Sequence, residues 1–95
     1  MVFISYSTYD EEIAQDLYHN IKKVNIPVFM AKESLEAGEK WSSKILSNLE
    51  ESDWVFYIAS QNSINSSAVQ HELGAALIQD KTIIPLLIDI TPESI

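Results

Sequence analysis

The residue best placed to do chemistry in this sequence is Glu72, which falls in the first two turns of a helix predicted over residues 68–79. Side chains on a helix lean toward its N-terminus, so the carboxylate is expected to point toward that end. His71 is rotated by about 100° around the same helix and faces elsewhere. A carboxylate there can compensate the helix dipole in solvent, the commoner role, or stabilise positive charge on a ligand. Position alone leaves both roles open.

Serine hydroxyls and one tryptophan are the remaining candidates. Ser5 and Ser60 each follow a short apolar run, and Ser66 precedes the helix that carries Glu72. Hydroxyls at such places form turns and helix caps more often than they contact a ligand. Trp41 begins an apolar helical stripe, which suits a core position and a ring-stacking role equally.

Several chemistries are disfavoured by what the sequence lacks. It has no Cys, which excludes disulfides, thiolate catalysis and Cys-ligated metals. His19 and His71 have no partner at metal-ligand spacing, so no metal site is predicted. Residues 5–10 contain no glycine where a backbone would approach phosphate, and no Gly-x-Ser-x-Gly elbow is present. The run ending in Ala59-Ser60 lacks the aspartate that a phospho-accepting switch would need.

Charge and hydropathy limit the classes of partner that the chain is expected to bind. Six Lys and Arg residues stand against 14 Asp and Glu residues, a formal charge of −8, and the basic residues cluster only at Lys22-Lys23. Nucleic-acid binding by counterion release needs a cationic patch, so no nucleic-acid partner is expected. The apolar runs are shorter than a membrane span, and the N-terminus lacks the pattern of a signal peptide. We therefore expect one soluble, cytoplasmic domain over residues 1–95, with no membrane partner.

The elements that must position these side chains alternate between β-type runs and helical stripes. Strands are predicted at residues 2–4, 27–31, 54–59 and 82–88, and polar loops at 32–40 and 60–67. Pro85 interrupts the last strand and weakens the predicted pairing there. Four strands joined by helices predict a parallel sheet covered on both faces, with the ligand crevice at the carboxyl ends of the strands.

The helices are predicted from their apolar stripes and capping signals. Thr8 with Glu11, and Ser67 with Gln70, have the spacing of a capping box and are predicted to begin the first and third helices. The first helix is expected to end near Lys23. The side chains expected to be buried are Ile13, Ala14, Leu17 and Ile21 in the first helix, Trp41, Ile45, Leu46 and Leu49 in the second, and Val69, Leu73, Ala76 and Leu77 in the third.

Three segments at the predicted strand ends together resemble the Toll/interleukin receptor (TIR) domain family. Phe3-Ile4-Ser5-Tyr6-Ser7 followed by Asp10 resembles its first motif, Leu35-Glu36-Ala37-Gly38 the loop after its second strand, and residues 60–73 its third-strand loop and helix. Order and spacing agree over essentially the whole chain. The resemblance implies a flavodoxin-like three-layer αβα fold, with strand order 2-1-3-4-5 and the fifth strand and last helix beyond Ile95.

The resemblance also implies a site. In the catalytic members a glutamate lies six residues after a serine, the relation of Ser66 to Glu72, so Glu72 is expected to be the catalytic residue. The family's nucleotide cleft falls on Phe3, Ser5, Leu35, Gly38, Trp41 and Ser66. Ala68 stands where the family often has Trp, which puts one ring contact to the ligand in doubt.

The implied function is an NAD glycohydrolase. Such an enzyme cleaves the ribosyl–nicotinamide bond of NAD, its substrate, to nicotinamide and ADP-ribose or a cyclic ADP-ribose, with no additional cofactor. The family resemblance further implies immune or cell-death signalling and self-association with other TIR domains. Two alternatives stay open, a non-catalytic TIR–TIR interaction module and an enzyme similar to the nucleoside deoxyribosyltransferases, which also set a carboxylate against a ribosyl centre.

Overall fold

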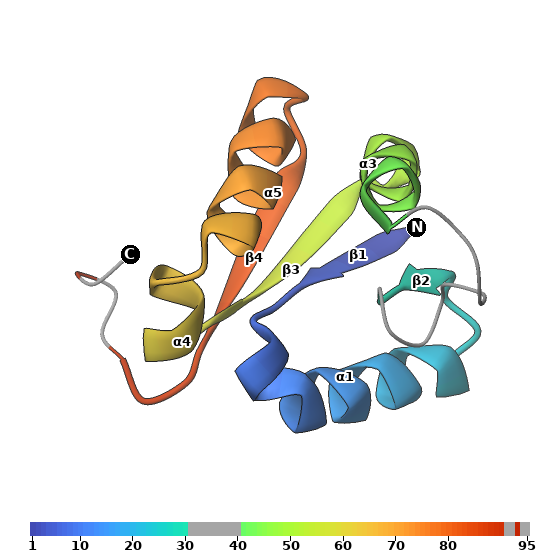
Figure 1. Cartoon of the computed structure of the whole chain (residues 1–95). Coiled ribbons are helices and arrows are strands. Elements are labelled where there is room, and N and C mark those ends of the chain that lie inside the picture. Colours follow the sequence, from blue (N-terminus) through green and yellow to red (C-terminus); the bar gives the residue numbers. More distant parts are fainter. Residues whose placement is uncertain (31–40, 91–92, 94–95) are drawn as a thin grey trace.

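A parallel β-sheet forms the centre of the molecule. The computed structural model describes residues 1–30, 41–90 and 93, and of residues 41 and 42 the backbone only. The four strands are β1 (Val2–Ser5), β2 (Val28–Phe29), β3 (Trp54–Ala59) and β4 (Thr82–Leu87). All three strand pairs are parallel, and the order is β2-β1-β3-β4 (Figure 1). The order that the family resemblance implies for these four strands is confirmed.

Helices cover both faces of the sheet. Helix α1 (Glu11–Lys23) lies on one face, and α3 (Trp41–Glu51) and α5 (Ser67–Ile78) lie on the other (Figure 1). Side chains alternate between the faces of a strand, so each strand feeds both layers of core. The fold is therefore the flavodoxin-like three-layer α/β fold that was expected. None of the described helices combines the length and the apolar character needed to cross a membrane.

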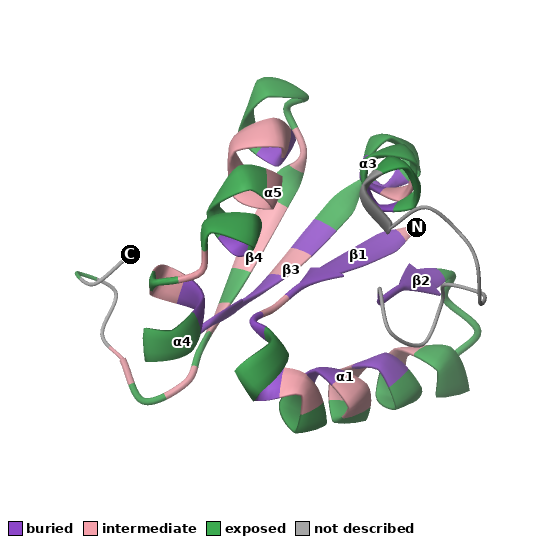
Figure 2. Ribbon diagram, in the orientation of Figure 1, coloured by how far each residue is buried: buried purple, intermediate pink, exposed green. Residues whose placement is uncertain are grey.

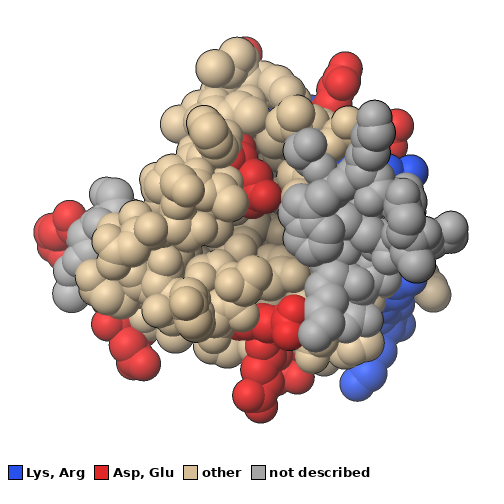
Figure 3. Space-filling model, viewed as in Figure 1, with Lys and Arg blue, Asp and Glu red and all other residues tan. Residues whose placement is uncertain are grey.

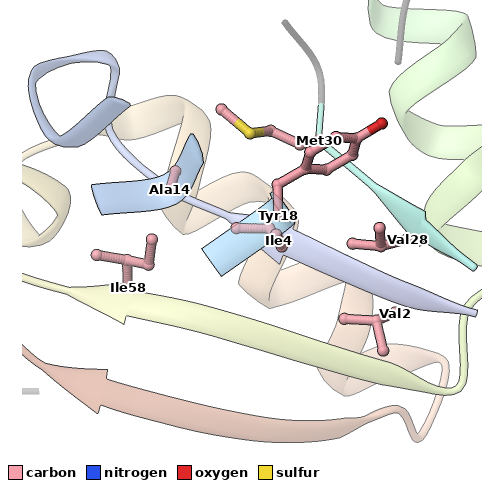
Figure 4. Close-up of a cluster of buried hydrophobic side chains, with 7 residues drawn as sticks. All are labelled: Val2, Ile4, Ala14, Tyr18, Val28, Met30 and Ile58. Atoms are coloured by element: carbon pink, nitrogen blue, oxygen red, sulfur yellow. The ribbon is translucent and has the colours of Figure 1, made fainter. Parts of the chain in front are cut away.

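The core is divided by the sheet into two layers. The layer beneath α1 joins β1, β2 and β3 to that helix, and Figure 4 shows its members: Val2, Ile4, Ala14, Tyr18, Val28, Met30 and Ile58. The layer beneath α3 and α5 is built on Phe3, Phe29, Ile45, Leu49, Val55 and Ala76. Purple buried segments therefore follow the central strands in Figure 2, while the outer helix surfaces are green.

The first helix begins later than its predicted cap. Ser7, rather than Thr8, is the N-cap, and its side chain accepts a hydrogen bond from the Tyr9 N–H at the start of a short 3₁₀ helix, Thr8–Asp10. Helix α1 follows from Glu11 and ends at Lys23, as predicted. Acidic residues in the first turn and basic residues in the last turn both complement the helix dipole.

The buried stripes also differ from prediction in detail. Tyr18 is buried four residues after Ala14, whereas Ile13 is 39% exposed because it is one position around the helix from Ala14. Leu46 and Leu77 were expected in the core and are 54% and 67% exposed. Each stands next to a fully or nearly buried residue, Ile45 or Ala76, that takes the inward position, and adjacent helix positions face about 100° apart.

The tract at residues 60–67, expected to be a loop, contains a short helix, α4 (Gln61–Ile64). Ser60 caps it in a reciprocal capping box with Ser63: each side chain accepts a hydrogen bond from the other's backbone N–H. Ser66, rather than Ser67, is the N-cap of α5, and its side chain accepts from the Val69 N–H. Ser66 therefore caps α5 one residue earlier than predicted, and the N-cap of α1 is Asp10 rather than Thr8.

Pro85 does not interrupt β4, which pairs with β3 from Thr82 through Leu87. The Thr82 N–H donates to the Asp53 carbonyl and the Ile88 N–H donates to the Ala59 carbonyl. Successive N–H groups along a strand point to opposite sides, so the odd-numbered residues of β4 face away from β3. The N–H that proline lacks falls on that other side, and no β3–β4 hydrogen bond is lost.

Candidate functional site

Helix α5 brings Glu72 to the carboxyl end of β1. Glu72 lies in the second turn of α5, and its Oε1 accepts a hydrogen bond from Ser5 Oγ at 2.7 Å. Ser5 is the last residue of β1 and is 0% exposed. The sequence predicted this placement of Glu72 from its position in the helix, and the structure brings the two residues together across 67 positions of the chain.

The Glu72 carboxylate forms part of the wall of a cavity at the tips of the strands. The cavity has about 220 Å³ of space open to water. It is lined by Phe3, Ile4 and Tyr6 from β1 and the segment after it, and by Thr8, Phe29, Ile45, Ser66, Ala68 and Glu72. Figure 3 shows acidic atoms set in a recess on this face, whereas other acidic side chains project from the outline. Within the described lining, Glu72 is the one acidic residue.

Burial changes the acidity of this group. It raises the pKa of the Glu72 carboxyl from 4.5 to about 7, and the hydrogen bond from Ser5 opposes the rise. Removal from water disfavours the charged form, while a donor held against a carboxylate favours it. A carboxyl group that titrates near neutral pH in a cavity is typical of functional sites.

Two other predicted site residues line the same cavity. Phe3 is almost fully buried and stacks on Phe29, with ring centroids 5.3 Å apart, so it forms an apolar floor. Ser66 lines the cavity at the N-terminus of α5, although its hydroxyl already caps that helix. Ser5 is different because it is not among the lining residues and reaches the cavity only through Glu72.

The remaining predicted residues lie outside what the structure describes. Leu35 and Gly38 fall within residues 31–40, and the Trp41 side chain is likewise outside the description, although its backbone begins α3. Ala68 lines the cavity, where it leaves room that a larger side chain would fill. The roles predicted for Leu35, Gly38 and Trp41 stay predictions.

A second polar cluster, which the sequence reasoning missed, fixes the cavity rim. Asp10 is buried, and its carboxylate accepts hydrogen bonds from Ser60 Oγ at 2.5 Å and from Asn62 Nδ2 at 3.1 Å. Ser63 Oγ in turn donates to the Tyr57 hydroxyl at 3.3 Å. The cluster ties the segment that carries Thr8 to α4, so one wall of the cavity is held to the end of β3.

Two signals in the sequence pointed to parts of this second cluster. Asp10 belongs to the first motif, and Ser60 has cap-forming character, yet neither pattern pairs residues 50 positions apart. Among the described residues, no three His, Cys, Asp or Glu side chains come together in a way that could hold a metal ion.

The sheet order, the helices on both faces and a cavity at the carboxyl ends of the strands define a flavodoxin-like α/β domain. The sequence model of the TIR domain matches residues 2–95, and the chain belongs to the TIR-domain family. A search of curated proteins found no match.

Solved structures agree with the family assignment. The TIR domain of the Toll-related receptor TRR-2 from Hydra magnipapillata is 21% identical, with a TM-score of 0.81 over 95% of this chain and 71% of that one. The TIR domains of the activated Roq1 resistosome, which recognises the pathogen effector XopQ, are 22% identical, with a TM-score of 0.86 over 98% of this chain and 60% of that one. At these identities the likeness establishes the fold alone.

Proposed function

We propose that this TIR domain cleaves the ribosyl–nicotinamide bond of NAD, with Glu72 as its catalytic residue. The observation that carries the proposal is a partly buried carboxylate in the wall of a largely apolar cavity at the strand tips. Membership of the TIR-domain family supports the choice of NAD as substrate. Because the described cavity is small for a dinucleotide, we place only the nicotinamide–ribose end of NAD beside Glu72.

The chemistry requires stabilisation of positive charge. The bond between C1′ of the ribose and the nicotinamide nitrogen breaks through an oxocarbenium-like state, and an ionised carboxylate beside the sugar lowers the energy of that state. Both electrons of the bond leave with nicotinamide, which is cationic in NAD and departs neutral. No general acid is therefore required, in keeping with Glu72 as the one acidic residue of the described lining.

The sugar cation is then captured by a nucleophile. Water attacks C1′ and loses a proton to give ADP-ribose, or a ring nitrogen of the adenine attacks C1′ to give a cyclic product. The charged form of Glu72 is the active one in this scheme. Its pKa of about 7 predicts that activity increases as pH rises through neutrality.

The decisive experiment follows nicotinamide release from NAD over time by chromatography. Glu72→Gln keeps the shape of the side chain but cannot become anionic, and we expect turnover to fall about 100-fold or more. Glu51→Gln is a matched control, because Glu51 is an exposed residue at the end of α3, away from the cavity lining. Circular dichroism verifies that both variants fold. Equal turnover by Glu72→Gln and wild type would refute the proposal.

The same samples distinguish the alternatives. Nicotinamide release with no release of free base from deoxynucleosides supports the glycohydrolase over a deoxyribosyltransferase-like enzyme. A folded wild-type domain that neither binds nor cleaves NAD at high protein concentration would favour a non-catalytic interaction module.

We further infer that the active form is an assembly of several copies. The last turn of α5 exposes two large apolar side chains, Leu77 at 67% and Ile78 at 84%, on the helix that carries Glu72. The TIR domains of the Roq1 resistosome, which this chain resembles, come from an assembled complex. Specific activity should therefore rise with protein concentration and fall in the double variant Leu77→Gln/Ile78→Gln. Specific activity that is independent of concentration would argue against assembly.

A further inference from the structure

We propose that Ser5 is a positioning residue, whose hydroxyl holds the Glu72 carboxylate in one orientation and does not contact the substrate. The catalytic part of this inference rests on the proposed function, but the contact itself does not. It replaces the expectation that Ser5 belongs to the nucleotide-binding surface.

The position of Ser5 is better suited to orienting Glu72 than to contacting a ligand. Ser5 is 0% exposed and is absent from the cavity lining, whereas Ile4 and Tyr6 on either side of it line the cavity. Its backbone lies in the parallel pair of β1 and β3, in register with Tyr57. A hydroxyl on a central strand has little freedom to move, so it offers a fixed point to the helix opposite.

The hydrogen bond that Ser5 donates also indicates a positioning role. A serine hydroxyl has one proton to donate, and Ser5 donates it to Glu72 Oε1 at 2.7 Å. That proton is then unavailable to a ligand. The carboxylate keeps acceptor sites on both oxygens for a sugar in the cavity. The contact restricts the rotation of the carboxylate and thereby the angle at which it meets a substrate.

The hydrogen bond from Ser5 also favours the anionic form of Glu72, in surroundings whose described residues are uncharged. The described residues that line the cavity with Glu72 carry no charge: Phe29 of β2, Ile45 of α3, Ser66 and Ala68 at the start of α5, and Thr8 before α1. Tyr6 is the other titratable group of the described lining. No Lys or Arg is among the described lining residues, and the Ser5 hydroxyl is a contact that lowers the pKa of the carboxyl against the effect of burial.

The test uses Ser5→Ala, which removes the hydroxyl and little volume. The primary readout is the titration midpoint of the Glu72 carboxyl carbon, followed by ¹³C NMR in protein without substrate. Loss of a hydrogen bond to a charged group should move the midpoint upward by about one pH unit. Ser52→Ala is the control: Ser52 is also 0% exposed, but its hydroxyl donates to the Asn48 carbonyl at the end of α3.

The secondary readout is the pH dependence of NAD cleavage. A positioning role predicts that the acid limb of the kcat profile shifts upward with the NMR midpoint, that kcat at pH 7 falls about fivefold, and that KM changes little. A raised KM with an unmoved midpoint would overturn the proposal and restore Ser5 to the binding surface. If Ser5→Ala does not fold, Ser5→Cys, a weaker donor of similar size, should give a smaller shift in the same direction.

The two readouts separate this inference from the proposed function. A midpoint that moves in a protein with no NAD cleavage supports the Ser5–Glu72 contact while contradicting the glycohydrolase. A midpoint that stays at its wild-type value in folded Ser5→Ala overturns the inference whatever the activity.

Discussion

Replacing Glu72 by glutamine should stabilise this domain above neutral pH and leave its stability unchanged in acid. The pKa of the Glu72 carboxyl is raised by burial from 4.5 to about 7, so the folded state binds its proton more tightly than the unfolded chain does. The stabilisation from that bound proton is complete below pH 4.5 and is lost as pH rises to about 7. Glutamine is neutral throughout and avoids this loss.

The expected gain in the free energy of unfolding follows from the pKa shift of Glu72. A difference between 4.5 and about 7 corresponds to about 3 kcal/mol at high pH, at about 1.4 kcal/mol per pH unit. Glu72 is partly exposed, and solvent reduces that figure, so we expect a gain of roughly 1 to 3 kcal/mol at pH 8. Ser5 Oγ can still donate to the amide oxygen of glutamine, so the existing contact is retained.

The assay is urea denaturation of wild type and Glu72→Gln at pH 4, 6 and 8, with Glu51→Gln as control for the loss of one charge from a chain of −8. The difference between Glu72→Gln and wild type should be near zero at pH 4 and should grow with pH, beyond any change in the control. A variant less stable than wild type at pH 8, or a difference of the same size at every pH, would refute the reasoning. If Glu72→Gln is instead more stable and also less active than wild type, that combination is what we expect of a residue kept for catalysis rather than for stability.

Three further outcomes are expected. The rate of NAD cleavage at saturating substrate should rise through about pH 7, and a rate that falls over that range would contradict an ionised Glu72 as the active form. Gly74→Ala should stabilise the fold by about 0.5 to 1 kcal/mol in thermal denaturation, because an added Cβ meets nothing within 4 Å and alanine favours the helix; a loss of stability would contradict this. Ser60→Ala should cost about 1 to 3 kcal/mol in urea denaturation, since it removes both the cap of α4 and a donor to the buried Asp10, whereas the exposed Ser47→Ala should cost far less.

The arrangement of the sheet was accessible from the sequence because its signals are local. Residues 54–59 form a continuous apolar run and were correctly predicted as an interior strand. The helix at 67–78 was predicted at 68–79 from its apolar stripe. Periodicity does not resolve the exact facing of each side chain. Leu77 and Ala76 both match a helical stripe, and packing against the sheet decides that Ala76 is the one buried.

Short elements and irregular positions were harder to predict. Helix α4 has four residues, too few to show a period, and its capping partner is Ser63 rather than the glutamate or glutamine that marks most capping boxes. The effect of Pro85 depended on which side of β4 its missing N–H would face, which the sequence does not encode without the register to β3.

In the candidate site, too, local features could be predicted from the sequence and features that depend on tertiary packing could not. The position of Glu72 near the strand tips follows from where α5 begins and how helical side chains lean, both of which are local properties. The raised pKa of its carboxyl depends on desolvation by side chains from several elements, so it could not be read from spacing. The pairing of Asp10 with Ser60 and Asn62 is likewise a product of tertiary packing.

Pro85 has a consequence for any strand that pairs with the outer side of β4. Along the side of β4 that faces away from β3, the N–H donors of Ile83 and Leu87 are separated by a proline that has none, a gap of about 13 Å at the rise of an extended strand. An extended peptide that paired with this side of β4 would leave its own carbonyl opposite Pro85 without a hydrogen-bond donor. A strand that pairs with this side of β4 must therefore be held by side-chain packing as much as by backbone hydrogen bonds.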